Sequence, residues 1–179
     1  MQEIPFVSGS YGAPVKIGSG FNTPISVAVD AAEDVFVADY NNGAVKEIPF
    51  GNGSYGTPIT IASGLGLPNG VALDAAGNIW VTNYDNAVKE IPFANGSYGA
   101  PVAIGSGFGK LSGVAVDAAG DVFVADFSNN AVKEIPFANG SYGAPVTIAS
   151  GFNQPVGLAV DSQGRLYVLD RNDLSIFLP

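Results

Sequence analysis

The chain has 179 residues, the length of one ordinary domain, and its 13% charged residues, 24 Gly and 12 Pro argue against a disordered chain and against a helical bundle. Seven Lys and Arg against 16 Asp and Glu give a net charge of -9, which disfavours nucleic acid and anionic membrane surfaces as partners. Cys and His are both absent, which excludes thiolate chemistry and any reaction that needs a His base or a His metal ligand.

Two short strands open the chain, at Gln2–Phe6 and Pro14–Ser19. The Glu-Ile-Pro-Phe motif of the first strand returns three times, and an Asp that closes a Val-Ala-Val-Asp-like segment returns with the same steps of 44, 43 and 44 residues. The motif starts at Glu3, Glu47, Glu90 and Glu134, and the Asp residues are Asp30, Asp74, Asp117 and Asp161. Two markers with one period predict a single domain over residues 1–179, built from repeats of about 44 residues.

Each repeat contains four strand-length apolar runs, rich in Val and Ile and bounded by turn residues. In the third repeat they are Gly113–Asp117, Asp121–Asp126, Ala131–Phe137 and Pro145–Ser150. We call such strands a, b, c and d. The c–d link contains Asn139-Gly140, a strong signal for a tight hairpin. Short links in chain order predict a four-stranded antiparallel meander in every repeat.

Meanders repeated in this way predict an all-β β-propeller with strand a innermost. Each unit reads Gly or Ser, then Val-Ala-Val-Asp, then a Val-Phe-Val-Ala-Asp-like run followed by Asn-Asn. This pattern resembles the NHL-repeat β-propeller family over essentially the whole chain. The resemblance implies a propeller of NHL-like blades, usually six in that family, and it slightly favours a secreted or extracytoplasmic protein, although no signal peptide is present in this chain.

The last predicted strands are Val156–Asp161 and Leu166–Asp170, which supply strands a and b of a fourth blade. Strands c and d of that blade are expected from Gln2–Phe6 and Pro14–Ser19, so the closing blade is shared between the two ends. Leu174–Pro179 also aligns with a c strand and competes with Gln2–Phe6 for one position. The chain is therefore expected to close as a four-bladed ring, to be a fragment, or to combine with other chains.

Alternation of the strands places the d–a and b–c loops on one face, here called the top face, where propellers usually bind ligands. These loops differ between repeats, whereas the c–d hairpins hardly change. The candidate residues for binding a ligand or partner are Asn22, Asp39, Tyr40, Asn83, Tyr84, Lys110, Asp126, Phe127, Asn153, Asp170 and Arg171. Drift in exposed loops explains the same variation, and Asx turns explain the Asp and Asn residues among them.

Three other repeated features have a structural explanation that we favour. The ring of Asp30, Asp74, Asp117 and Asp161 is expected to cap turns rather than hold calcium, so we expect no metal site. The repeated Tyr residues of the c–d links are expected to pack rather than to bind glycans. The Asn-Gly-Ser sequences, formal glycosylation acceptors, are expected to be hairpin turns.

The sequence thus favours a non-catalytic propeller that binds a peptide, a glycan or a small molecule through its top loops, without a cofactor and without catalytic residues. The alternative is a duplicated or engineered propeller, or a piece of a larger one, whose main property is self-assembly through its terminal strands. A lyase-like or lactonase-like enzyme with a carboxylate-bound metal and no His is the third possibility.

Overall fold

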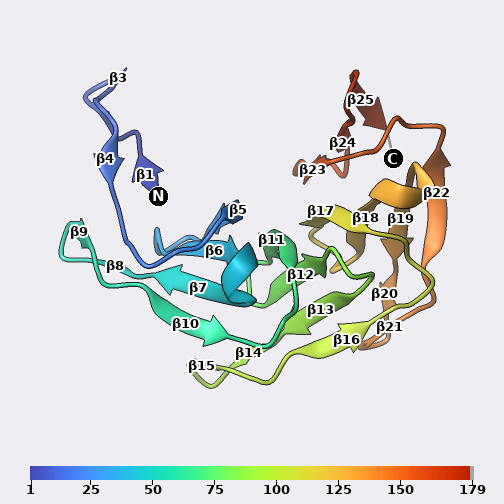
Figure 1. Cartoon of the computed structure of the whole chain (residues 1–179), viewed down its shortest axis with the longest axis horizontal. Helices are drawn as coiled ribbons and strands as arrows, with labels where there is room; N and C mark the ends of the chain where they lie inside the picture. The colour runs from blue at the N-terminus through green and yellow to red at the C-terminus, as the bar shows by residue number, and fades with distance from the viewer. Residues whose placement is uncertain (178–179) are drawn as a thin grey trace.

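The computed structural model describes residues 1–177, and these residues form a β-propeller (Figure 1). In each blade, antiparallel strands follow one another in chain order from the axis outwards, because every link is short. The innermost strands are β5 (Pro24–Val29), β11 (Pro68–Leu73), β17 (Leu111–Val116) and β23 (Gly157–Val160). The second strands are β6 (Val35–Asp39), β12 (Ile79–Asn83), β18 (Val122–Asp126) and β24 (Leu166–Leu169).

The third and fourth strands complete the blades. The third strands are β7 (Ala44–Ile48), β13 (Val88–Ile91), β19 (Ala131–Ile135) and β25 (Leu174–Phe177), and the fourth strands are β10 (Ile59–Ala62), β16 (Val102–Ile104) and β22 (Val146–Ser150). Two 3-10 turns, η1 (Tyr40–Asn42) and η2 (Phe127–Asn129), lie between the second and third strands of the first and third blades. The predicted all-β, NHL-like propeller of four repeats is confirmed, and the strands of the third repeat lie within two residues of their predicted ends.

A small hairpin projects after each c strand, because a Pro ends the strand and an Asn-Gly-type turn reverses the chain. The hairpins are β2 (Phe6–Val7) with β3 (Ser10–Tyr11), β8 (Phe50–Gly51) with β9 (Ser54–Tyr55), β14 (Phe93–Ala94) with β15 (Ser97–Tyr98), and β20 (Phe137–Ala138) with β21 (Ser141–Tyr142). In the last one, Asn139 and Gly140 have φ angles of 52° and 77°, as a type I′ turn requires. The prediction that the Asn-Gly-Ser sequences form turns is confirmed.

The two ends of the chain differ from the expected closing blade. The N-terminal strands β1 (Gln2–Glu3) and β4 (Val15–Lys16) pair with each other, and within the described residues no pairing joins them to β24 or β25. Strand β25 takes the place of strand c beside β24, with Leu169 opposite Leu174. Figure 1 shows the sheets of the two ends at opposite ends of an arc of blades. Leu174–Phe177, and not Gln2–Phe6, therefore forms the third strand of the last blade. Residues 178 and 179 of the predicted segment Leu174–Pro179 lie outside the described residues.

The core lies between neighbouring blades rather than inside one sheet. One cluster joins Phe36, Val45 and Ile79 of the first two blades, and another joins Trp80, Val122 and Ile135 of the second and third. Each blade therefore depends on its neighbour for burial of its apolar face, as in other repeat proteins. None of the described residues belongs to a helix that is long and apolar enough to span a bilayer.

Gly70 lies where the inner strands β11 and β17 approach closely. A Cβ atom there would lie 2.6 Å from the Ser112 carbonyl oxygen and 2.6 Å from the Thr82 Oγ1 atom. Gly70→Ala is therefore expected to lower the free energy of unfolding by about 2 kcal/mol, measured by urea denaturation, because the strands must separate. Gly51→Ala is the matched control, since its Cβ meets nothing within 4 Å and it should be nearly neutral. Equal stability of the two variants would contradict this close approach.

Candidate functional site

The top face is formed by the d–a loops and the b–c turns, and buried carboxylates hold the two together. The Asp39 Oδ1 atom accepts a hydrogen bond from the Asn22 N–H at 2.6 Å, and its Oδ2 atom lies 2.6 Å from Asn42 Nδ2 and 2.7 Å from Lys46 Nζ. Burial opposes ionisation of Asp39, but these hydrogen bonds and the Lys46 charge outweigh it and lower the pKa of the carboxyl. Asp39 is fully occupied by the protein's own donors.

The third blade repeats this arrangement. Asp126 is also fully buried and accepts from the Gly109 N–H at 3.0 Å, from Asn129 Nδ2 at 2.8 Å and from Lys133 Nζ at 2.9 Å. In each case the carboxylate fixes the entry to an inner strand against the turn that follows the second strand. We therefore assign Asp39 and Asp126 to the support of the top loops and not to contact with a ligand.

In the other two blades, the residue at this position holds the loops with a different set of hydrogen bonds. Asn83 is buried and its Nδ2 donates to the Leu65 carbonyl, while its Oδ1 has no hydrogen-bond partner within the described residues. Asp170 accepts from the backbone N–H groups of Asn153, Asn172 and Asp173, each at 2.8 Å, and these bonds lower the pKa of its carboxyl. Asn83 and Asp170 thus also hold loops in place.

The aromatic and cationic candidates form two groups on the top face. The rings of Tyr40 and Tyr84, from neighbouring blades, meet edge to face with centroids 6.5 Å apart. Lys110 Nζ lies 4.6 Å from the centroid of the Tyr84 ring and 3.4 Å from its hydroxyl. The Arg171 guanidinium lies 5.3 Å from the centre of the Phe127 ring. We call these five residues the aromatic-cation arc, which extends over all four blades.

The two remaining candidates, Asn22 and Asn153, lie beside this arc. Both side chains are exposed, and the backbone carbonyl oxygens of these residues accept from the backbone N–H groups of Asn41 and Arg171, each at 3.1 Å. The structure therefore brings seven of the eleven candidates to the exposed top face and uses the other four as buried or turn-capping supports.

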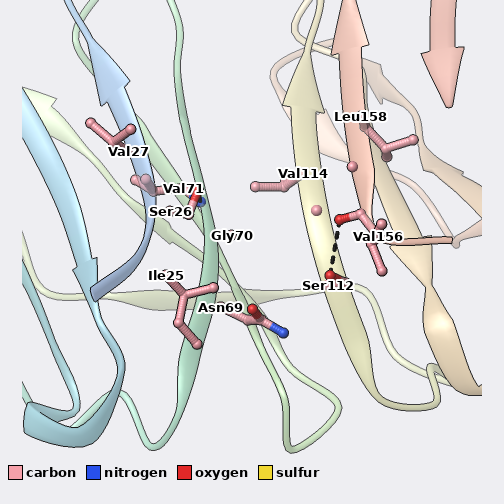
Figure 2. A pocket seen from close by; sticks show the side chains of 12 residues that line it. Ile25, Ser26, Val27, Asn69, Gly70, Val71, Ser112, Val114, Val156 and Leu158 are labelled. Carbon is pink, nitrogen blue, oxygen red and sulfur yellow. Dashed lines mark hydrogen bonds between the residues drawn. The ribbon is translucent and has the colours of Figure 1, made fainter. Parts of the chain in front are cut away.

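Sequence reasoning did not single out the pocket on the concave side of the inner strands. Its volume is about 220 Å³, and it is lined at the top ends of these strands by groups such as Ile25, Asn69, Val114 and Leu158 (Figure 2). Its polar side chains connect neighbouring blades: Ser112 Oγ donates to the Val156 carbonyl at 2.9 Å, as Figure 2 shows. The signal was the polar residue or Gly that begins each Val-Ala-Val segment, which sequence analysis used only to define the repeat.

The four Asp residues that close the inner strands cap turns, as predicted. Asp30 Oδ1, for example, accepts from the backbone N–H groups of Ala32 and Asp34, each at 2.9 Å, and the other repeats copy these bonds. Each carboxylate faces its own turn. Among residues 1–177, no three Asp or Glu side chains come together as a metal site.

Comparison with known proteins confirms the predicted resemblance. The sequence profile of the NHL repeat matches residues 108–135 and 152–177. No curated protein matches the chain. The chain is thus a four-bladed β-propeller whose third and fourth repeats match the NHL repeat.

Solved structures with this fold include three whose chains are much longer. A catalytically inactive virginiamycin B lyase from Staphylococcus aureus with quinupristin is 14% identical, with a TM-score of 0.66 over 97% of this chain and 61% of that one. A gluconolactonase from Xanthomonas campestris is 18% identical (TM-score 0.69, 85% of this chain, 57% of that one). A PQQ-bound aldose sugar dehydrogenase from Streptomyces coelicolor is 15% identical (TM-score 0.68, 91% and 62%). This chain thus spans less than two thirds of each.

These likenesses contradict the prediction that the chain is not an enzyme, because the three solved structures named above are a lyase, a gluconolactonase and a dehydrogenase. The prediction relied on the absence of His and Cys. That absence removes only the mechanisms that need those side chains, whereas carboxylates, phenols and Lys are also able to transfer protons. At 14–18% identity the likeness shows the fold alone.

Proposed function

We propose that the top face binds a small polyhydroxylated acid, such as a sugar acid, on the aromatic-cation arc. The observation that carries this proposal is the alternation of aromatic rings with two cations along the arc, at Tyr84 with Lys110 and at Phe127 with Arg171. Aromatic faces are apolar surfaces against which the C–H faces of a sugar ring pack, and a guanidinium or an ammonium pairs with a carboxylate. Both kinds of group are therefore available to one ligand.

The charge distribution supports an anionic group on the ligand. The chain has a net charge of -9, so an anion binds only where cations gather locally. Within the described residues the side-chain ion pairs involve Lys46, Lys133 and Arg165. Lys110 and Arg171 instead lie over aromatic rings on the exposed face, where their N–H groups remain accessible to a carboxylate.

The hydroxyl groups of the ligand also find partners beside the arc. Asn22 and Asn153 are exposed next to Tyr40 and Arg171, and Asp85 and Asp173 lie on the turns that contain Tyr84 and Arg171. Amides and carboxylates accept hydrogen bonds from sugar hydroxyls, while a simple fatty acid offers them nothing. The names of two structures with this fold, a gluconolactonase and an aldose sugar dehydrogenase, also favour a sugar-derived ligand.

Calorimetric titration of the chain with D-gluconate tests the proposal. Gluconate is expected to bind more tightly than D-glucose, which lacks the carboxylate, and more tightly than acetate, which lacks the hydroxyls. Tyr84→Ala and Lys110→Ala are each expected to weaken binding about tenfold, because each removes one contact of about 1.4 kcal/mol. Lys89→Ala, a change of the same charge on the third strand of the second blade, should leave the affinity unchanged.

The same samples are assayed for hydrolysis of gluconolactone, because the fold carries that activity in a related structure. Hydrolysis that is lost with Tyr84→Ala would place the reaction at the same face. If gluconate binds no better than acetate, or if Tyr84→Ala and Lys89→Ala bind it equally, the aromatic-cation arc is not a site for a sugar acid.

A further inference from the structure

Neighbouring blades meet at seams, and a Tyr–aromatic contact recurs in these seams. Two surfaces of this chain each have one half of that contact without the other half. In the first two seams, the Tyr of a c–d hairpin packs on the second-strand aromatic residue of the preceding blade. Tyr98 meets Phe36 edge to face with centroids 6.1 Å apart, and the Tyr142 hydroxyl accepts a hydrogen bond from Trp80 Nε1 at 3.0 Å. Burial and neighbouring carboxylates raise the pKa of both Tyr residues to about 12.

The third blade has the same receptor without its Tyr. A pocket of about 320 Å³ there is lined by Phe123, the counterpart of Phe36 and Trp80, and by acidic groups from the same places as those around Tyr98 and Tyr142. We call it the tyrosine socket, and its lining is Asp117, Asp121, Phe123, Glu134, Ile148, Gly164, Leu166 and Phe177. Ile148 is 41% exposed, whereas its counterpart Ile104, in a filled seam, is 6% exposed.

The N-terminal hairpin carries the matching side chain. Tyr11 occupies the same hairpin position as Tyr98 and Tyr142, and its ring packs at a tilt against Phe6 with centroids 4.9 Å apart, as the Tyr142 ring does against Phe137. Yet Tyr11 is 77% exposed and Phe6 is 63% exposed, because no preceding blade covers them. Neighbouring large apolar side chains that are exposed together are typical of an interaction surface.

A second pair of surfaces is complementary in the same way. Tyr55, from the first complete blade, borders a pocket of about 420 Å³ that Glu3, Val15 and Ile17 also line. In the internal seams, the second-strand aromatic residue of the preceding blade fills this place, and its counterpart at the end of the chain is Tyr167 on β24. One docking step thus fills both pockets, Tyr11 entering the tyrosine socket while Tyr167 reaches Tyr55.

We propose that two copies of this chain join head to tail, each placing Tyr11 in the tyrosine socket of the other. Strand β1 of one copy then lies beside β24 of the other and replaces β25, and Ile4 takes the place of Phe177. Ile4 is the counterpart of Ile48, Ile91 and Ile135, which are buried in their blades, but it is 57% exposed here. The exchange buries this side chain and leaves no unpaired edge on β1 or β24.

The occupant is a second copy because the curvature of the arc separates the two surfaces within one chain. Successive inner strands contact one another from β5 to β11, β17 and β23, and the sheets at the two ends lie apart in Figure 1. The same arc overlays on 57% and 62% of two longer propellers with TM-scores of 0.69 and 0.68. The four blades of one copy therefore leave a ring of this kind incomplete, and further blades are needed to close it.

Light scattering during size exclusion tests the dimer in solution. The 179-residue chain is expected to elute at twice 18.2 kDa. Tyr11→Glu, which brings a negative charge to an acidic socket, and Ile148→Glu, which charges the socket wall, are each expected to elute as monomers. Both residues are exposed, so the far-UV circular dichroism of each variant should match the unmodified chain. Val102→Glu is the control, since it charges a 53% exposed residue of the outer strand β16 and should remain dimeric.

Mixing the two variants gives the sharpest test. The Ile148→Glu chain keeps its Tyr11 and the Tyr11→Glu chain keeps its socket, so an equimolar mixture is expected to regain dimers through one intact seam. A monomeric unmodified chain at every concentration, a dimeric Tyr11→Glu chain, or a mixture that stays monomeric would each overturn the proposal. Ligand titration at the top face is independent of this result, because the socket lies at the opposite ends of the strands.

Discussion

Trp80→Ala is expected to lower the free energy of unfolding by about 4 kcal/mol, the largest effect that we expect of any single substitution. Trp80 is 1% exposed and packs in the cluster that joins the second and third blades. Its removal leaves a cavity in a seam, and it also removes the hydrogen-bond donor of the half-buried Tyr142 hydroxyl. Since neighbouring blades stabilise one another, the loss should also broaden the unfolding transition as the blades uncouple.

Urea unfolding followed by far-UV circular dichroism measures this effect, since Trp80 is the one Trp of the chain and its fluorescence is lost with it. Trp80→Phe is the matched variant, because Phe36 and Phe123 occupy the same position in other blades. It should cost about 1 kcal/mol, the value of the lost hydrogen bond, and Tyr142→Phe should cost a similar amount. A Trp80→Ala chain within about 1 kcal/mol of the unmodified chain would contradict the packing role of this seam.

The repeats make the blades predictable from the amino-acid sequence alone. Each strand c ends before a Pro, as at Ile135 and Pro136, and each following turn contains a residue that tolerates positive φ, such as Asn139. Because the same pattern occurs four times, a strand that is hard to recognise in one repeat can be placed from its counterparts in the others. The strand order follows from the short links alone.

The closing blade is not predictable in the same way. Gln2–Phe6 and Leu174–Pro179 both align with strand c, and their residue patterns do not rank them. Within one chain, β25 follows β24 after a turn of four residues, whereas β1 lies more than 160 residues away from β24. A short loop costs much less conformational entropy to close, which favours β25 within a single chain. In the dimer that we propose, the second chain changes that balance because Tyr11 fills the tyrosine socket.

The support role of the top-face carboxylates required knowledge of burial. The sequence shows an Asp before an aromatic residue, a pattern that fits a ligand site as well as a turn. The missed signal is a Lys seven residues later, at Lys46 after Asp39 and at Lys133 after Asp126, which returns on the neighbouring strand to pair with the carboxylate. The second repeat is one residue shorter in this turn and has Asn83 in place of Asp, so the ion pair is absent there.

Asp39→Ala is expected to lower the free energy of unfolding by about 3 kcal/mol at neutral pH. The substitution removes the acceptor of the Asn22 N–H at a fully buried position, and it leaves the Lys46 ammonium and the Asn42 amide with only the Gly20 carbonyl oxygen as acceptor. Asp170→Ala is the control at the equivalent turn of the last blade. Its carboxylate accepts only backbone N–H groups, so its loss should cost about 1 kcal/mol.

The difference between the unmodified chain and Asp39→Ala should also depend on pH. Because the folded state lowers the pKa of Asp39 below its ordinary value of 3.8, the folded protein binds fewer protons there than the unfolded chain. The stability that Asp39 contributes is therefore complete above that value and is lost as the pH falls below it. Urea unfolding of both chains at neutral pH and near pH 3 measures this change. If the difference in free energy of unfolding between the two chains stays constant over that range, the neutral carboxyl group stabilises the turn as well as the ion pair does. The charge of Asp39 would then not be what stabilises this turn.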